Sequence, residues 1–115
     1  MVTRTLTEPA FFILTALVEG PRHGYGIVGE VAQLSDGRVQ LKIGTLYGVL
    51  DRLVSDALVE LDREEVERGR LRRYFRLTES GRRSLSAEAE RHAANARVAS
   101  DRLRAFRPAN QGGAA

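Results

Sequence analysis

Residues 42–78 constrain the fold most, because a helical pattern is followed there by two strand patterns. Ile43, Leu46, Leu50, Leu53 and Ala57 are spaced by three and four residues in turn, which predicts one apolar face of a helix. A short apolar run at 58–61 and an alternating run at 72–77 predict two strands, joined by the charged, glycine-containing stretch 62–70 as a long hairpin tip. A helix followed by such a hairpin is typical of the reading half of a winged helix-turn-helix.

The opposite face of this helix is small and polar, with Gly44, Gly48, Asp51, Arg52 and Ser55. Each glycine lowers helix stability by about 1 kcal/mol relative to alanine, so two of them on one face favour a role in close approach. A DNA groove is one surface that such a face can approach. An ordinary solvent-facing side is the alternative.

Positive charge is concentrated in and just after the hairpin. Residues 63–83 hold eight arginines against four glutamates, an excess of four, although the whole chain carries only +3. This placement indicates a wing that meets phosphates. Lys42, the only lysine, precedes the reading helix, where it either contacts a phosphate or is a solvated charge.

Length and composition exclude several classes. A chain of 115 residues predicts one domain with an appended helix. The absence of cysteine excludes disulfides and thiolate metal sites and fits a reducing cytoplasm. The apolar run at 10–18 is too short to span a bilayer, which needs about twenty residues, so we interpret it as a buried helix and expect no membrane partner. No catalytic set, metal-spaced cluster or phosphate loop is present, so we expect no enzyme, cofactor or metal.

The N-terminal part predicts two helices. Thr7 can cap a first helix that runs to about Glu19 and is apolar on nearly every side, so that it needs covering on two faces. A second helix opens at His23, a lone histidine that we interpret as a structural hydrogen-bonding group, and ends near residues 35–37. Residues 39–41 alternate and are expected to add a small third strand to the hairpin.

A long C-terminal helix begins at Thr78 and carries a heptad seam. Isolated helices of this kind are marginal in water, so the seam is expected to pack against its counterpart in a second chain, helped by the first helix. Packing within one chain is the alternative. His92 is either a pH-sensitive group on the seam or a tolerated edge residue. The predicted dimerisation residues are Phe11, Phe12, Leu85, Ala89, His92, Ala96, Ala99, Leu103 and Phe106.

Three motifs in order, HGYGI at 23–27, GTLYGVLDRL at 44–53 and RRYFRLTESGRRSL at 72–85, resemble those of the PadR family of bacterial transcriptional regulators. The resemblance implies a winged-helix repressor, dimeric through its C-terminal helix, that releases its operator when a small molecule or another signal arrives. The chain is similar to the short branch with a single C-terminal helix. It departs from the family at Ala57, where glycine is usual, so that turn is expected to be reshaped. Without tryptophan in the C-terminal helix, an aromatic-lined drug pocket is not expected.

The combined prediction is a mainly α fold of the α+β class, a winged helix-turn-helix domain at 1–80 with a C-terminal dimerisation helix at 81–107 and a disordered tail at 108–115. The expected function is a homodimeric regulator of double-stranded operator DNA with a possible small-molecule effector. A winged-helix protein-interaction module is the alternative. The predicted DNA-binding residues are Lys42, Gly44, Thr45, Tyr47, Gly48, Arg52, Arg68, Arg70 and Arg72.

Overall fold

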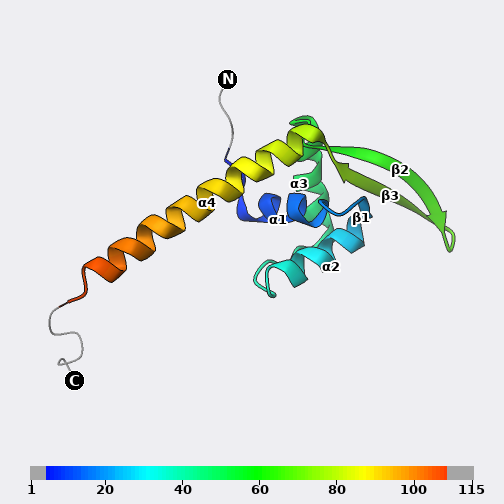
Figure 1. Ribbon diagram of the computed structural model, residues 1–115. Coiled ribbons are helices and arrows are strands. Elements are labelled where there is room, and N and C mark those ends of the chain that lie inside the picture. The colour runs from blue at the N-terminus through cyan, green and yellow to red at the C-terminus, as the bar shows by residue number, and fades with distance from the viewer. Residues whose placement is uncertain (1–4, 109–115) are drawn as a thin grey trace.

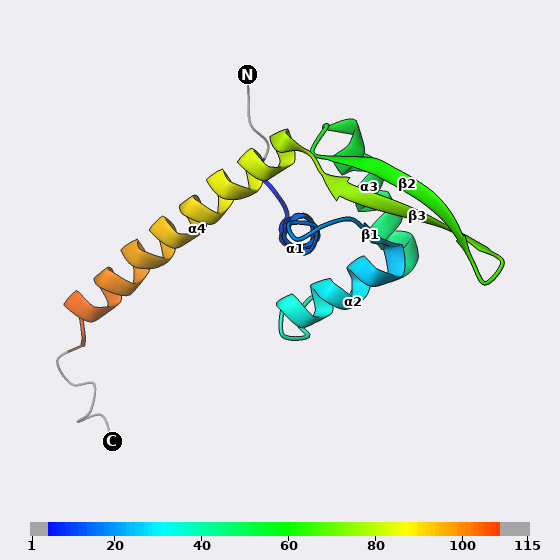
Figure 2. The same ribbon diagram turned by 45° about the vertical axis from the view of Figure 1, so that its right-hand side comes forward.

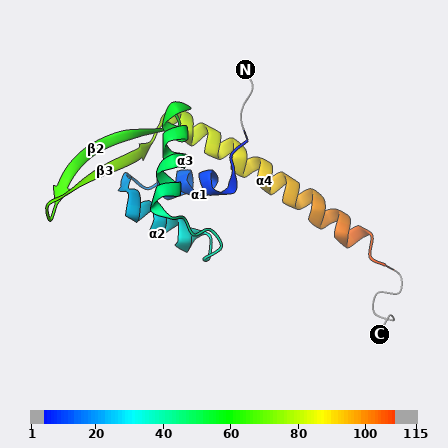
Figure 3. The same ribbon diagram turned by 180° about the vertical axis from the view of Figure 1, so that it is seen from behind.

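The computed structural model describes residues 5–108, which form four helices and a three-stranded sheet (Figure 1). The predicted α+β class and winged-helix architecture are confirmed. The hairpin and α4 extend to opposite sides of the other three helices, as the view from behind also shows (Figure 3). The elements are α1 (Glu8–Ala16), β1 (Arg22–His23), α2 (Gly24–Leu34), α3 (Ile43–Ser55), β2 (Val59–Glu67), β3 (Arg70–Leu77) and α4 (Glu79–Ala105).

The core lies where α1, α2 and α3 meet the base of the hairpin. Figure 2 shows α1 end-on between α2 and α4. The predicted apolar face of α3 is confirmed for Leu46, Leu50 and Leu53, which are buried, and Ile43 is half-buried. Ala57, the last residue predicted for this face, is exposed and lies beyond the end of the helix. The remaining buried apolar side chains are Ala10, Ile13, Leu14, Ala16, Leu17, Ile27, Val31, Val39, Val59 and Phe75.

Two predicted helix starts are confirmed, but α1 is shorter than expected. Thr7 Oγ1 accepts a hydrogen bond from the Ala10 amide at 3.2 Å, and Thr78 Oγ1 accepts one from the Gly81 amide at 2.9 Å. The first helix ends at Ala16 instead of near Glu19. The amides of Leu17 and Val18 bond three residues back instead of four, which tightens the chain into turns before Gly20.

The C-terminus of α3 is not reshaped, which corrects the expectation for Ala57. Ala57 adopts φ 63°, the left-handed conformation. Its amide bonds to the Val54 carbonyl and the Leu58 amide to the Leu53 carbonyl, both at 2.9 Å, which is the Schellman pattern. The two hydrogen bonds hold the turn in place, although the left-handed conformation is unfavourable for alanine.

We expect Ala57→Gly to stabilise the fold by about 0.5–1 kcal/mol. Relief of the left-handed alanine is worth about 1–2 kcal/mol, and the greater freedom of glycine in the unfolded chain removes part of it. Urea unfolding followed by circular dichroism measures the change. A midpoint below that of the unmodified protein would show that Ala57 is not strained.

The hairpin has a tight turn instead of the predicted long tip. The strands β2 and β3 pair in register from Val59↔Leu77 to Glu67↔Arg70, with a bulge between Leu61 and Arg63. Only Arg68 (φ 50°) and Gly69 (φ 78°) lie between the strands, and two positive φ angles are typical of a type I′ turn. Residues 62–67, of which all but Val66 are charged, belong to β2. Their Glu and Arg side chains can pair with those of the neighbouring strand.

The third strand is β1, not residues 39–41, so that prediction is wrong. Arg22 pairs with Phe75 and His23 with Tyr74, which places β1 beside β3 in the order β1-β3-β2. Val39 lies in a loop instead, where its amide donates to the buried Ser35 hydroxyl at 2.9 Å.

The long helix α4 packs on its own chain only at its beginning. Leu85 packs against the core, Glu88 is buried, and the His92 ring lies 4.8 Å from the Phe11 ring between centroids. Phe11 and Phe12 are half-buried, and Phe12 contacts the core.

The rest of the predicted seam is exposed, including Ala89, Ala96 and Ala99, and Leu103 and Phe106 are each 74% exposed. Residues 109–115 of the predicted tail lie outside the described residues. No helix between residues 5 and 108 is long and apolar enough to cross a bilayer.

Candidate nucleic-acid interface

One face of α3 is open to solvent and carries four of the predicted DNA-binding residues. Gly44, Thr45, Gly48 and Arg52 are exposed. A Cβ atom added at Gly44 or Gly48 would meet nothing within 4 Å. The backbone of α3 is therefore accessible at both glycines, and Arg52 has no ion pair or side-chain hydrogen bond to another described residue.

The N-terminus of α3 has no side-chain cap. Lys42 is the N-cap residue, it is exposed, and its side chain makes no capping hydrogen bond. Uncapped amides at a helix N-terminus carry partial positive charge, and an ammonium beside them adds to it. This end of α3 is therefore suited to an anionic partner.

Most wing arginines are paired within the hairpin. Arg63 pairs with Asp62 and Glu65, Arg73 lies 3.5 Å from Glu64, and Arg76 pairs with Glu60 and Asp62. The carboxylates raise the pKa of Arg63, chiefly through the hydrogen bond to Glu65.

Two of the predicted DNA-binding arginines, Arg68 and Arg70, form no ion pair over residues 5–108. Arg68 lies in the turn and Arg70 at the start of β3, so the unpaired positive charge of the wing is at its tip.

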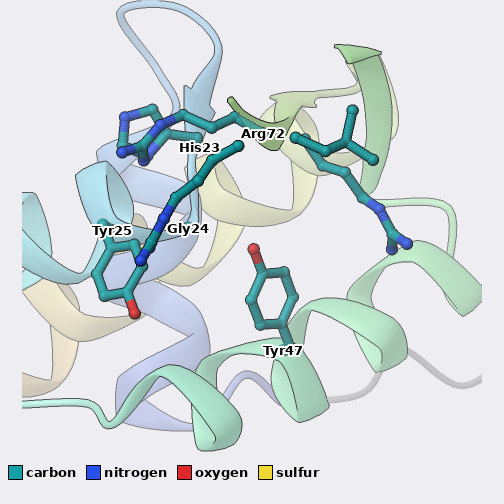
Figure 4. Close-up of a pocket in the computed structure, with 8 residues that line it drawn as sticks. His23, Gly24, Tyr25, Tyr47 and Arg72 are labelled. Atoms are coloured by element: carbon teal, nitrogen blue, oxygen red, sulfur yellow. The ribbon is translucent and has the colours of Figure 1, made fainter. Parts of the chain in front are cut away.

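The three motifs of the sequence meet at one junction between α2, α3 and β3, which we call the motif junction (His23, Gly24, Tyr47, Arg72 and Tyr74). A Cβ atom on Gly24 would lie 2.7 Å from Tyr47 Oη, so the tyrosine packs directly on the backbone of α2. In Figure 4 the Tyr47 ring points from α3 toward Gly24, and the His23 ring lies against Arg72. Sequence reasoning missed this contact, although the small residue after His23 was a signal for it.

Two predicted DNA-binding residues, Tyr47 and Arg72, therefore have partners within the protein. Tyr47 is half-buried and its ring lies 6.4 Å from that of Phe75. Arg72 Nε lies 3.0 Å from Glu67 Oε1, an ion pair whose geometry falls short of a hydrogen bond. A cavity of about 80 Å³ opens at this junction, lined also by Tyr25, Arg70, Leu71 and Arg73.

Tyr74 and Glu67 complete the outer side of the motif junction. The Tyr74 hydroxyl donates to Glu67 Oε2 at 2.9 Å, and this hydrogen bond is the main cause that raises the pKa of Tyr74 above its ordinary value near 10. The guanidinium of Arg63 lies 4.0 Å from the centroid of the Tyr74 ring. The arrangement offers no metal site, since no group of three or more His, Asp or Glu side chains suited to a metal occurs in the part of the chain that the structure describes.

In a comparison with known protein families, residues 13–87 match the transcriptional regulator PadR-like family. An uncharacterized protein X of Lysinibacillus sphaericus is 35% identical over 74 residues, which cover 64% of this chain and 68% of that protein.

Two solved structures have the same fold. A PadR family transcription regulator from Clostridium difficile R20291 is 25% identical with a TM-score of 0.67, covering 84% of this chain and 99% of that one. The Bacillus subtilis PadR in complex with operator DNA is 22% identical with a TM-score of 0.60, covering 67% and 44%.

Proposed function

The chain belongs to the PadR-like family of transcriptional regulators, and from this premise we propose that it is a dimeric, sequence-specific DNA-binding repressor released by a small molecule or another signal. The observation that carries the proposal is the open face of α3 beside a wing whose unpaired arginines are at the tip. The Bacillus subtilis PadR, whose structure contains operator DNA, supports it through the shared fold.

The proposed contacts divide by type. On α3, Gly44, Thr45, Gly48 and Arg52 face the bases of a major groove, because their side is open and small enough for close approach. Phosphate contacts come from Lys42 at the start of α3 and from Arg68 and Arg70 on the wing. We assign Tyr47 and Arg72 to holding the motif junction, since their side chains already have partners there.

A second copy of the chain is the proposed cover for the outer half of α4. The described side chains of this helix beyond residue 92 are exposed, and in Figure 2 the end of the helix extends away from the other helices. Pairing the seams of two helices would bury Leu103 and Phe106, with residues 1–80 as the DNA-binding domain and 81–107 as the dimerisation helix. Two reading helices would then enter successive major grooves about 10 base pairs apart.

Two arginine variants test the proposed contacts. We expect Arg70→Ala to weaken binding to every sequence and to lower the salt dependence of log Kd by about one. Arg52→Ala should relax preference at one base pair, by about 1–3 kcal/mol. Fluorescence anisotropy at several salt concentrations, with a selected genomic fragment and a random duplex, measures both. Equal loss on both duplexes in the two variants would remove the base-reading role of Arg52.

The oligomeric state and the affinity for random duplex at low salt test the function as a whole. Sedimentation should show a dimer, and anisotropy should show binding that salt weakens. A monomer with no affinity would overturn the proposal. A dimer with no affinity would favour a protein-interaction or scaffold module instead.

A further inference from the structure

His23 Nδ1 lies between two hydrogen-bond donors. The Gly26 amide donates to it at 3.2 Å, which caps α2, and Arg72 Nη1 lies 3.3 Å away. An amide N–H and a guanidinium N–H can only donate, so both bonds require an Nδ1 without a proton. The ring hydrogen is therefore on Nε2, and the imidazole is neutral in this arrangement.

The Arg72 bond links the wing to the helices. β1 pairs with β3 only at Phe75 and Tyr74, so residues 70–73 project past the edge of this pairing. By contrast, the side-chain hydrogen bonds of Arg63, Tyr74 and Arg76 all stay within the hairpin. For residues 5–108, the contact of Arg72 with His23 is the only side-chain hydrogen bond between the projecting wing and the helical part.

We propose that His23 is a positioning residue that fixes the wing relative to α3, and that it does so only while its imidazole is neutral. A proton added at Nδ1 would face the amide of Gly26 and the guanidinium of Arg72. Both hydrogen bonds would be lost, and two positive charges would face each other. The wing would then be free to change its angle to α3, which lowers DNA affinity.

The surroundings of the imidazole offer no compensation for a positive charge. The Tyr74 ring packs edge-on at 5.3 Å between centroids, and Arg70 and Arg73 line the same cavity. Glu67 is engaged by Arg72 and Tyr74, and Glu30 by Arg22. No carboxylate of the described residues lies within ion-pair distance of His23. A proton on Nδ1 would therefore face the Arg72 guanidinium with no carboxylate in ion-pair distance of the imidazole.

The expected effect on DNA affinity rests on the proposed function. The variant His23→Asn tests whether His23 causes this effect. Asparagine is a good N-cap and accepts a hydrogen bond, but it does not titrate. Histidine changes charge between pH 5 and 8, so we compare Kd for a random duplex at pH 8 and pH 5.5 at fixed ionic strength. The loss of about one net hydrogen bond predicts that acid weakens the unmodified protein about fivefold more than His23→Asn.

His92→Asn is the matched control, because the chain has only two histidines. This variant separates the two histidines, because His92 is a predicted dimerisation residue and His23 is not. A pH dependence that is lost in His92→Asn and kept in His23→Asn would assign the effect to the seam and overturn the proposal. An identical pH dependence in His23→Asn and the unmodified protein would overturn the proposal.

Nitrogen NMR of the His23 ring gives a readout that needs no DNA. At pH 7.5 the shifts should show Nδ1 unprotonated and Nε2 protonated, and on acidification the amide signals of residues 70–73 should change together with those of the ring. A ring protonated at Nδ1 at pH 7.5, or wing signals that do not follow the titration, would overturn the role of His23. A protein that passes this test but binds no DNA would refute only the proposed function.

Discussion

Gly81→Ala is expected to destabilise the fold by about 1–3 kcal/mol, although alanine is the better helix former by about 1 kcal/mol. Gly81 is in the first turn of α4, and a Cβ atom there would lie 2.0 Å from the Leu58 carbonyl oxygen and 2.9 Å from Leu77 Cδ1. The Leu58 oxygen is a backbone atom that already accepts the Thr78 amide at 3.1 Å. Relief of the clash therefore requires the start of α4 to move away from Leu58, which lies between α3 and β2.

Gly29→Ala is the matched control for this prediction. Gly29 lies inside α2, is exposed, and has nothing within 4 Å of an added Cβ. The same change there should stabilise the protein by about 1 kcal/mol through helix propensity alone. Chemical unfolding at equal protein concentration measures both, because dimerisation would make stability depend on concentration. Two variants that shift the midpoint in the same direction would show that Gly81 is not in close contact with Leu58.

The sequence predicted those parts of the fold that depend on local spacing. The leucines of α3 recur with the helical period, and their burial follows directly from it. Thr7 precedes a helix whose first amides need acceptors, so its capping role could be predicted from position alone. For Thr78 the prediction was the start of the last helix, and its capping hydrogen bond follows the same rule.

Contacts between distant segments could not be predicted in this way. β1 is only two residues long, and nothing in Arg22 and His23 indicates a strand; its pairing depends on where β3 passes. Ala57 adopts the left-handed conformation because the carbonyls of Leu53 and Val54 then receive hydrogen bonds. These two hydrogen bonds outweigh the preference of alanine for other conformations. The close approach of Gly81 to Leu58 likewise exists only after β2 and α4 have packed.

The same distinction between local spacing and distant contacts applies to the candidate site. The open face with Gly44 and Gly48 follows from the helical period, so the sequence could place it. The partners of Arg72, Glu67 and His23, depend on the hairpin register and on the position of α2. The sequence alone therefore contained no sign of them, and Arg72 was predicted to contact DNA. Tyr47 was predicted to contact DNA, but the absence of a side chain at Gly24 lets its ring pack against the backbone of α2.

Leu46→Ala is expected to cost about 2–5 kcal/mol of stability, because Leu46 is 0% exposed at the centre of the core. Removal of the side chain loses buried apolar area and leaves a cavity that neighbouring leucines of α3 cannot fill without moving the helix.

The control for Leu46→Ala is Leu34→Ala, the same chemical change at a residue that is 42% exposed, which should cost much less because water already reaches that side chain. Thermal and urea unfolding at matched concentration compare the two variants. Since Leu46 and the exposed glycines lie on opposite faces of α3, equal stability of Leu46→Ala and the unmodified protein would mean that α3 is rotated. The face assigned to DNA would then be wrong as well.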